Sequence, residues 1–377
     1  MKRIYLDHNA TTPIDPLVAE VMMQEFAKGP QNPSSVHFFG QEAKKTLLTS
    51  RQTIARFLKV KPQEILFTSG GTESMNLLIR GSLPPKGAHL ITTDLDHPCV
   101  YENMQTLEQA GYHVSFLSPG KAGAPSPKQV VAAIRQDTKL IILSAVNSET
   151  GVKLDIDSIA KIAQEANIPL ILDGVALLGK EPFAIPHGVT GMGFSAHKFH
   201  GPRGIGFCFL RSGSPLSPLF LGGNQESHLR AGTENLPGIV GLATAISLLE
   251  KEGKAYSAHM HHLRDLFEKT LKKSIPNLQI NGTGPRVANT SNLCFPGVDG
   301  ESLLIHLDMK GIAASHATAC SAGALEVSRV LLNMGLPKEE ASCSLRFSFS
   351  RMNTEEEVLQ ATKIISEAVE SYTRLPQ

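Results

Sequence analysis

One lysine in this chain stands where its amine could act as a nucleophile. Lys198 follows an apolar run at 189–194 and precedes a turn rich in glycine and proline at 201–204, after which a second apolar run covers 205–210. Apolar runs of this length, bounded by turn residues, are typical of buried strands. Because burial disfavours the charged ammonium form, a lysine between two such strands offers its lone pair for attack on a carbonyl carbon.

A carboxylate is expected close to this lysine. Residues 169–173 form another run typical of a buried strand, and Asp173 ends it. In parallel α/β sheets, ligands collect at the carboxyl ends of the strands. Pyridoxal phosphate (PLP) needs a lysine for its Schiff base and a carboxylate beside its pyridinium nitrogen. Lys198 and Asp173 together therefore predict a PLP enzyme.

A possible phosphate site lies at 63–78, where a strand, a glycine turn and the start of a helix follow one another. Backbone N–H groups and the positive end of the helix dipole bind anions at such a junction. An ordinary helix start would show the same spacing. In a chain that also carries Lys198 and Asp173, we expect Gly71 and Thr72 to bind the phosphate of the cofactor.

Two further polar residues follow predicted strands. His97 comes after the strand at 89–94 and before a helix, where a single histidine is most often a cap; an imidazole that titrates near neutrality can also transfer protons. Asn147 follows the apolar run at 139–146 and should reach the same sheet edge as Asp173.

The segment at 316–325 surrounds Cys320 with small residues, which suits an accessible loop better than a core. A thiol in such a loop is a candidate nucleophile. The five cysteines are odd in number and form no CxxC pair, so we expect no disulfide framework and no metal site. Cys208 and Cys294 lie in apolar runs and are expected to be inert. Arg346, in an alternating segment at 344–350, would by itself be a surface strand residue.

These motifs resemble those of the cysteine desulfurases, the NifS/IscS-like group of class-V aminotransferases, from Tyr5 to about Arg351. The resemblance implies that His97 stacks on the PLP ring and takes part in proton transfer. It also implies a set of cofactor contacts: Gly71, Thr72, His97, Asn147, Asp173, Ser195, His197, Lys198 and Thr233.

The resemblance further implies the reaction. The substrate would be L-cysteine, bound through Asn147 and Arg346, and the catalytic residues would be Lys198, His97 and Cys320. The thiolate of Cys320 would attack the substrate sulfur, which leaves L-alanine and a persulfide. That persulfide would pass to an acceptor, such as an iron–sulfur scaffold or a tRNA thiolation system.

The chain departs from the family pattern in two places. Ala176 stands where the family usually has a glutamine, three residues after the aspartate. Alanine cannot make the hydrogen bond of that amide to the ring oxygen of the cofactor, a loss of about 1 kcal/mol. Residues 316–318 also differ from the family pattern. Three alternatives therefore remain. A selenocysteine lyase would use the same residues, another class-V aminotransferase or an epimerase would not need Cys320, and a PLP-binding dimer without activity would be compatible with Ala176.

The alternation of predicted strands and helices favours an α/β fold. We expect a large PLP-binding domain at 15–250, with a mostly parallel sheet flanked by helices, as in fold type I PLP-dependent transferases. A smaller α+β domain should comprise 1–14 and 251–377 and carry the Cys320 loop. The long helical pattern from Leu236 to Leu271 is expected to break near 252–254.

The net charge of +1 gives no electrostatic reason to expect binding to nucleic acid or to an anionic membrane. No apolar run approaches the roughly 20 residues that span a bilayer, and the first residues contain no signal-peptide core. We therefore expect a soluble, cytoplasmic protein. The resemblance implies a homodimer in which Thr233 contacts the cofactor phosphate of the partner subunit.

Overall fold

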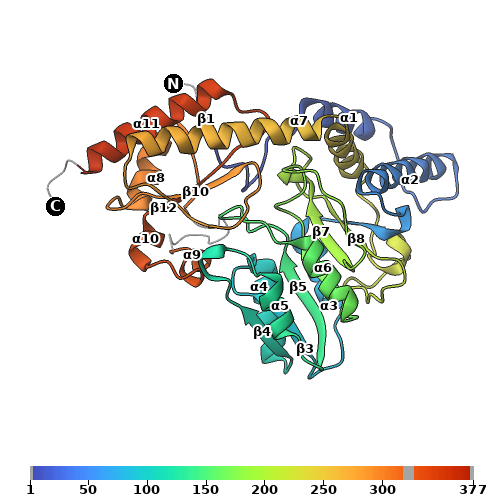
Figure 1. Cartoon of the computed structure of the whole chain (residues 1–377). Helices are drawn as coiled ribbons and strands as arrows, with labels where there is room; N and C mark the ends of the chain where they lie inside the picture. Colours follow the sequence, from blue (N-terminus) through green and yellow to red (C-terminus); the bar gives the residue numbers. More distant parts are fainter. Residues whose placement is uncertain (1–2, 317–326, 374–377) are drawn as a thin grey trace.

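The structure is a computed structural model that describes residues 3–316 and 327–373 (Figure 1). Its centre is a seven-stranded sheet with the strand order β2-β8-β7-β6-β5-β3-β4. Strands β3 to β7 pair in parallel, and β8 pairs antiparallel with both β7 and β2. The predicted mostly parallel α/β sheet is therefore confirmed. Its strands are β2 (Ile65–Thr68), β3 (His89–Thr93), β4 (His113–Leu117), β5 (Thr138–Ser144), β6 (Leu170–Asp173), β7 (Gly191–Ser195) and β8 (Gly206–Leu210).

Helices cover both faces of this sheet because alternate strand residues point to opposite sides. In β5, Leu140 and Ile142 pack into one core, and Ile141 and Leu143 pack into the other. The first core is completed by α3 (Gly71–Gly81) and α4 (Pro98–Gln109). The second is completed by α2 (Phe38–Leu58), α5 (Pro127–Ala133), α6 (Ile156–Glu165) and the first half of α7 (Leu236–Ser274). Helix α1 (Pro16–Phe26) packs on α7.

A second group of elements has its own core. Strands β9 (Gln279–Ile280), β10 (Thr290–Cys294) and β12 (Ser344–Ser348) form an antiparallel sheet in the order β12-β10-β9, and β1 (Ile4–Tyr5) pairs with β11 (Ile312–Ala313). The second half of α7 packs here with α8 (Gly300–Met309) and α11 (Glu355–Thr373). Two short helices, α9 (Arg329–Asn333) and α10 (Lys338–Ser342), precede β12. The predicted domain division remains a prediction, and its limit at residue 250 falls inside α7.

The predicted break in the long helix is wrong. Helix α7 runs unbroken past Gly253 and joins the two groups of elements (Figure 1). Its first half places Ile246 in the core of the large sheet, and its second half places Phe267 in the core of the small one. Burial at both ends outweighs the cost of one glycine in a helix, about 1 kcal/mol.

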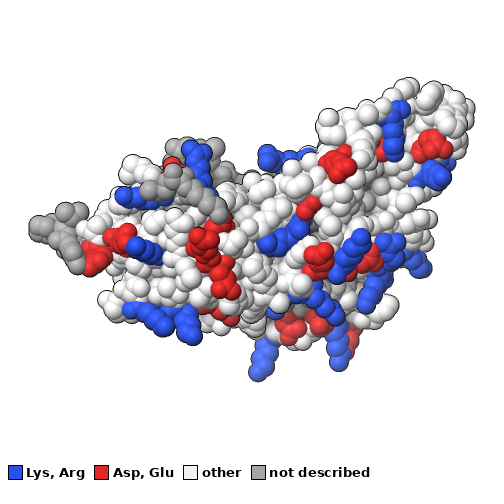
Figure 2. Space-filling model, turned by 90° about the horizontal axis from the view of Figure 1, so that it is seen from above, with Lys and Arg blue, Asp and Glu red and all other residues white. Residues whose placement is uncertain are grey.

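Within the described part of the chain, no helix combines the length and the apolar character needed to cross a membrane. On the face seen in Figure 2, acidic and basic side chains are interspersed, as the near-zero net charge leads one to expect.

Candidate active site

A cavity of about 220 Å³ lies at the carboxyl ends of β5, β6 and β7. The parallel pairing places Ser144 of β5 opposite Asp173 of β6, so residues far apart in the sequence reach the same edge. Most of the predicted site residues line this cavity: Gly71, Thr72, His97, Asp173, Ser195, His197, Lys198 and Arg346.

Asp173 ends β6 and is buried in the cavity wall. Its Oδ1 accepts a hydrogen bond of 2.9 Å from the backbone N–H of Val175. Burial raises the pKa of Asp173 to about 6, although that hydrogen bond opposes the change. A cationic group against this carboxylate would offset the cost of burying its charge.

Lys198 ends a short 3-10 turn that follows β7. Its Nζ donates to the carbonyl oxygens of Asn9 and Ala10, and the bond to Ala10 measures 3.0 Å. The backbone N–H of Thr12 donates to the carbonyl of His197 at 2.9 Å, so the N-terminal segment packs directly on the turn. The amine therefore stays inside the cavity, within the reach of a ligand bound at Asp173.

His97 is the N-cap of α4, and its Nδ1 accepts a hydrogen bond of 3.2 Å from the backbone N–H of Cys99. Because Nδ1 accepts, the neutral ring carries its proton on Nε2. Burial lowers the pKa of His97 to about 4, with smaller effects from Lys198 and Arg329. The histidine is thus both a helix cap and a neutral imidazole in the cavity wall.

The first residues of α3 form a second wall. A side-chain Cβ at Gly71 would lie 2.6 Å from Cγ2 of Val175, so only glycine permits this close approach. Helix α3 has eleven residues, and the free backbone N–H groups at its start offer an anion site. Ser195, at the end of β7, lies beside Gly71.

Arg346 lies on β12 and is only 3% exposed, unlike the surface residue that its local sequence suggests. Its Nη2 donates to Oδ1 of Asp7 at 2.8 Å and to Oγ of Ser315 at 3.2 Å, and its Nη1 donates to the carbonyl of Ser148. Among the described residues its Nε has no hydrogen-bond partner. The guanidinium thus brings a positive charge to the cavity wall.

Two predicted residues do not line the cavity. The side chain of Asn147 donates to the carbonyl of Leu95 at 3.1 Å and accepts from the backbone N–H groups of Glu149 and Thr150, so it stabilises the turn at 147–151. Thr233 is exposed and lines a separate pocket of about 170 Å³.

Cys320 lies outside the described residues. The described residues on either side of that segment are anchored close to the cavity: Ser315 pairs with Arg346 through two backbone hydrogen bonds, and Ser328 donates to the buried carboxylate of Glu149. Cys208 and Cys294 are fully buried, and burial raises the pKa of the Cys294 thiol to about 11. Both thiols suit the inert role expected of them.

Sequence reasoning missed Lys180, which lines the cavity and is only 3% exposed. Lysines are seldom this buried, and a single lysine after a glycine gives no signal that it will be. Cys99 also lines the cavity, and the side-chain ligand atoms of His97, Cys99 and Asp173 lie within 4.8 Å of one another. These three ligand atoms could hold a metal ion. The same residues line the cavity that would hold a cofactor, so the two would occupy the same space.

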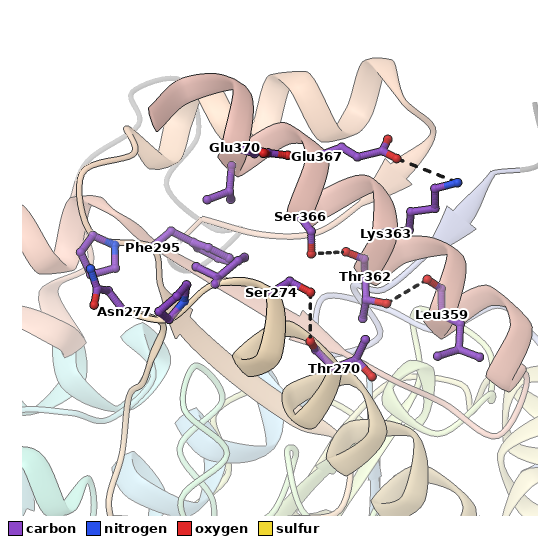
Figure 3. Close-up of a pocket in the computed structure, with 14 residues that line it drawn as sticks. Thr270, Ser274, Asn277, Phe295, Leu359, Thr362, Lys363, Ser366, Glu367 and Glu370 are labelled. Carbon is purple, nitrogen blue, oxygen red and sulfur yellow. Dashed lines mark hydrogen bonds and ion pairs between the residues drawn. The ribbon is translucent and has the colours of Figure 1, made fainter. Parts of the chain in front are cut away.

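A larger cavity of about 610 Å³ lies between the end of α7 and α11 (Figure 3). It contains none of the predicted site residues. Its charged side chains include Lys363 and Glu367, which are exposed. Their Nζ and Oε1 atoms are 4.0 Å apart. Size alone therefore does not mark the reactive site.

Comparison with known proteins agrees with this geometry. The family model for class-V aminotransferases matches residues 4–360. The chain is 38% identical over 376 residues to the cysteine desulfurase IscS of Dictyoglomus turgidum, covering 98% of this chain and 95% of that protein. The chain is a cysteine desulfurase family member.

Two solved structures support the same placement. A NifS-like protein superposes with a TM-score of 0.90 at 33% identity, covering 98% of this chain and all of that one. A structure of SspA in complex with cysteine superposes with a TM-score of 0.82 at 32% identity, covering 93% and 100% of the two chains. The predicted family is thus confirmed, and so is the predicted fold of a PLP-dependent transferase.

Proposed function

We propose that this protein is a PLP-dependent cysteine desulfurase, which converts L-cysteine to L-alanine and leaves the sulfur as a persulfide on Cys320. The observation that carries the proposal is a single cavity that holds the amine of Lys198, the carboxylate of Asp173 and the guanidinium of Arg346. The membership of the chain in the cysteine desulfurase family selects L-cysteine among the possible amino acids.

The residues present fit PLP. Asp173 is a buried carboxylate that interacts electrostatically with Lys198, and it would pair with the pyridinium nitrogen. The start of α3, at Gly71 and Thr72, would hold the phosphate, with Ser195 and His197 beside it. His97 would face the ring. When bound, PLP supplies an electron sink that makes the Cα proton of an amino acid acidic.

The protein's own groups then have separate tasks. Arg346 binds the substrate carboxylate and must share its guanidinium with Asp7 to do so. The amine of Lys198 takes the proton from Cα and returns it, because its Nζ is a basic group held inside the cavity. His97, neutral above a pH of about 4, offers its Nε2–H to a nearby oxygen. The predicted contact of Asn147 with the ligand would require its side chain to leave the 147–151 turn.

The sulfur step is assigned to Cys320. Its thiolate would attack the substrate sulfur, so that an S–S bond forms as the C–S bond breaks and the released carbon takes up a proton. The product persulfide then serves an acceptor protein, such as an iron–sulfur scaffold or a tRNA thiolation enzyme. The cytoplasmic location expected from the sequence stays a prediction.

A homodimer is part of the proposal. Large apolar side chains on α1, at the start of α2 and in the connection between them are exposed to solvent, among them Met23, Phe26, Val36 and Phe38. Exposed apolar side chains grouped in this way are typical of a surface that another chain covers. The exposed position of Thr233 is compatible with its predicted contact with the phosphate of the partner subunit.

The test is to incubate the PLP-loaded protein with L-cysteine and to measure alanine together with persulfide on Cys320 by mass spectrometry. Equal amounts of both products are expected. Lys198→Ala should abolish turnover, and Cys320→Ser should release no sulfur but still bind L-cysteine. Full turnover by Cys320→Ser would overturn the proposal and favour another class-V reaction. A strong preference for selenocysteine would favour a lyase, and PLP absorbance without alanine would favour a binding protein.

A further inference from the structure

Lys180 is a buried ionisable residue of the cavity wall that the proposed reaction leaves unused. It lies after β6 and lines both the active-site cavity and a second, small cavity. Its Nζ donates a hydrogen bond of 2.9 Å to the backbone carbonyl of Lys198. The side chain thus contacts the turn that carries the catalytic amine.

The turn at 196–201 is held by contacts from several elements. Thr12 bonds to the carbonyl of His197 and to the backbone N–H of His200. Among the described residues, the carbonyl of Lys198 receives its hydrogen bond from Lys180. The neighbouring Gly179 has φ +81°, and a Cβ there would lie 2.5 Å from Cβ of Phe199. The two segments are therefore packed as closely as backbone atoms allow.

The charges around this contact are few. The groups that interact electrostatically with Lys180 include Lys198 and three histidines, His8, His197 and His200. Arg351 lines the same small cavity as Lys180. Burial lowers the pKa of His8 to about 3 and those of His197 and His200 to about 4, so all three are neutral near pH 7.

On the cavity side, Lys198 faces the neutral imidazole of His97 and the carboxylate of Asp173. No ion pair joins Lys180 to a carboxylate in the described part of the chain. Burial, and then Lys198, lowers the pKa of Lys180 to about 7. A buried amine without a counter-ion is costly to keep, which suggests a functional reason for its place.

We propose that Lys180 is a positioning residue that fixes the carbonyl of Lys198 and that, in its protonated form, places a second positive charge near the catalytic amine, which disfavours protonation of that amine. The inference rests on the proposed function, because it assigns Lys180 to the same PLP site. A nearby like charge lowers the pKa of a base, and Lys180 and Lys198 interact in this way. A catalytic amine that must accept a proton from Cα gains from starting unprotonated.

Three variants of the PLP-loaded protein test this inference. Lys180→Met removes the hydrogen bond and the charge, and Lys180→Gln keeps a donor without the charge. The matched control is Lys128→Met, an exposed lysine on α5. The main readout is the pH midpoint of the visible absorbance change of the PLP–Lys198 adduct, and kcat and KM for L-cysteine are measured in parallel.

We expect both Lys180 variants to raise that midpoint by about one pH unit and to lower kcat at pH 7 about tenfold, with KM changed less than about twofold. Lys128→Met should match the unaltered protein. An unchanged midpoint in either PLP-loaded Lys180 variant would overturn the inference. So would unfolding or loss of PLP in both variants, since Lys180 would then be a structural or cofactor-binding residue.

The midpoint needs bound PLP but no turnover. If the protein binds PLP and releases no alanine from L-cysteine, the proposed function fails, and the midpoint still tests Lys180.

Discussion

The carboxylate of Asp7 and the guanidinium of Arg346, 339 residues apart in the sequence, form an ion pair of 2.8 Å at the wall of the cavity. Both side chains are largely buried, so the pair is screened little by water. Its position means that a substrate carboxylate would meet an arginine whose orientation is already fixed.

Substitution of this arginine should weaken substrate binding and leave PLP in place. In Arg346→Lys, a single ammonium replaces the planar guanidinium, and a hydrogen bond to the charged substrate carboxylate is lost. KM for L-cysteine should therefore rise about 10- to 100-fold. Steady-state kinetics and the PLP absorbance are the measurements. The control is Arg56→Lys, because Arg56 forms an exposed ion pair with Glu250. It should change neither KM nor the PLP absorbance. A normal KM in Arg346→Lys would remove this residue from the substrate site.

The affinity of the PLP-free protein for PLP should depend on pH through Asp173. Burial raises the pKa of this carboxyl to about 6 in the free site, and a pyridinium partner would lower it. Below pH 6 the bound state therefore holds fewer protons than the free state, so affinity should fall about tenfold for each pH unit as the pH decreases.

The check is the Kd of PLP between pH 5 and pH 8 in the unaltered protein and in Asp173→Asn. The titration of PLP itself is common to both proteins. The additional loss of PLP affinity below pH 6 should occur only in the unaltered protein. If the affinity of Asp173→Asn for PLP falls equally steeply with decreasing pH, another group is responsible.

The departure at Ala176 can be tested by restoring an amide. Ala176 lines the cavity, so a longer side chain would extend into the space that PLP fills. Ala176→Gln should tighten PLP binding about fivefold, the effect of one hydrogen bond of about 1 kcal/mol. Ala176→Met has a similar size and no donor, and should give no gain. Equal affinities for the two variants would mean that the amide makes no such bond.

The unbroken course of α7 predicts a stabilising substitution. At Gly253 the atom nearest to an added Cβ is 3.9 Å away, so Gly253→Ala should raise the free energy of unfolding by about 0.5–1 kcal/mol. In the same helix, a Cβ at Gly241 would lie 2.7 Å from the sulfur of Met22, and Gly241→Ala should destabilise the protein. Urea unfolding measures both. A loss of stability in Gly253→Ala would mean that the helix needs flexibility there.

The sequence by itself determined the local elements and the chemistry of the site. The apolar runs before Asp173 and Lys198 have the length of strands buried on both faces, and both residues follow such a run at the sheet edge where ligands bind. The alternation of strands and helices was enough to predict the parallel sheet, because both features depend on residues close together in the chain.

Only the tertiary structure decided which of these side chains meet. Arg346 has the local sequence of a surface strand, yet the packing of β12 buries it against Asp7. Lys180 contacts Lys198 because Gly179 lets the two segments approach closely. Helix α7 stays unbroken because two separate cores bury its two halves. Periodicity along the chain fixes which face a residue occupies, but the distance between remote residues is set by how the finished sheets and helices pack.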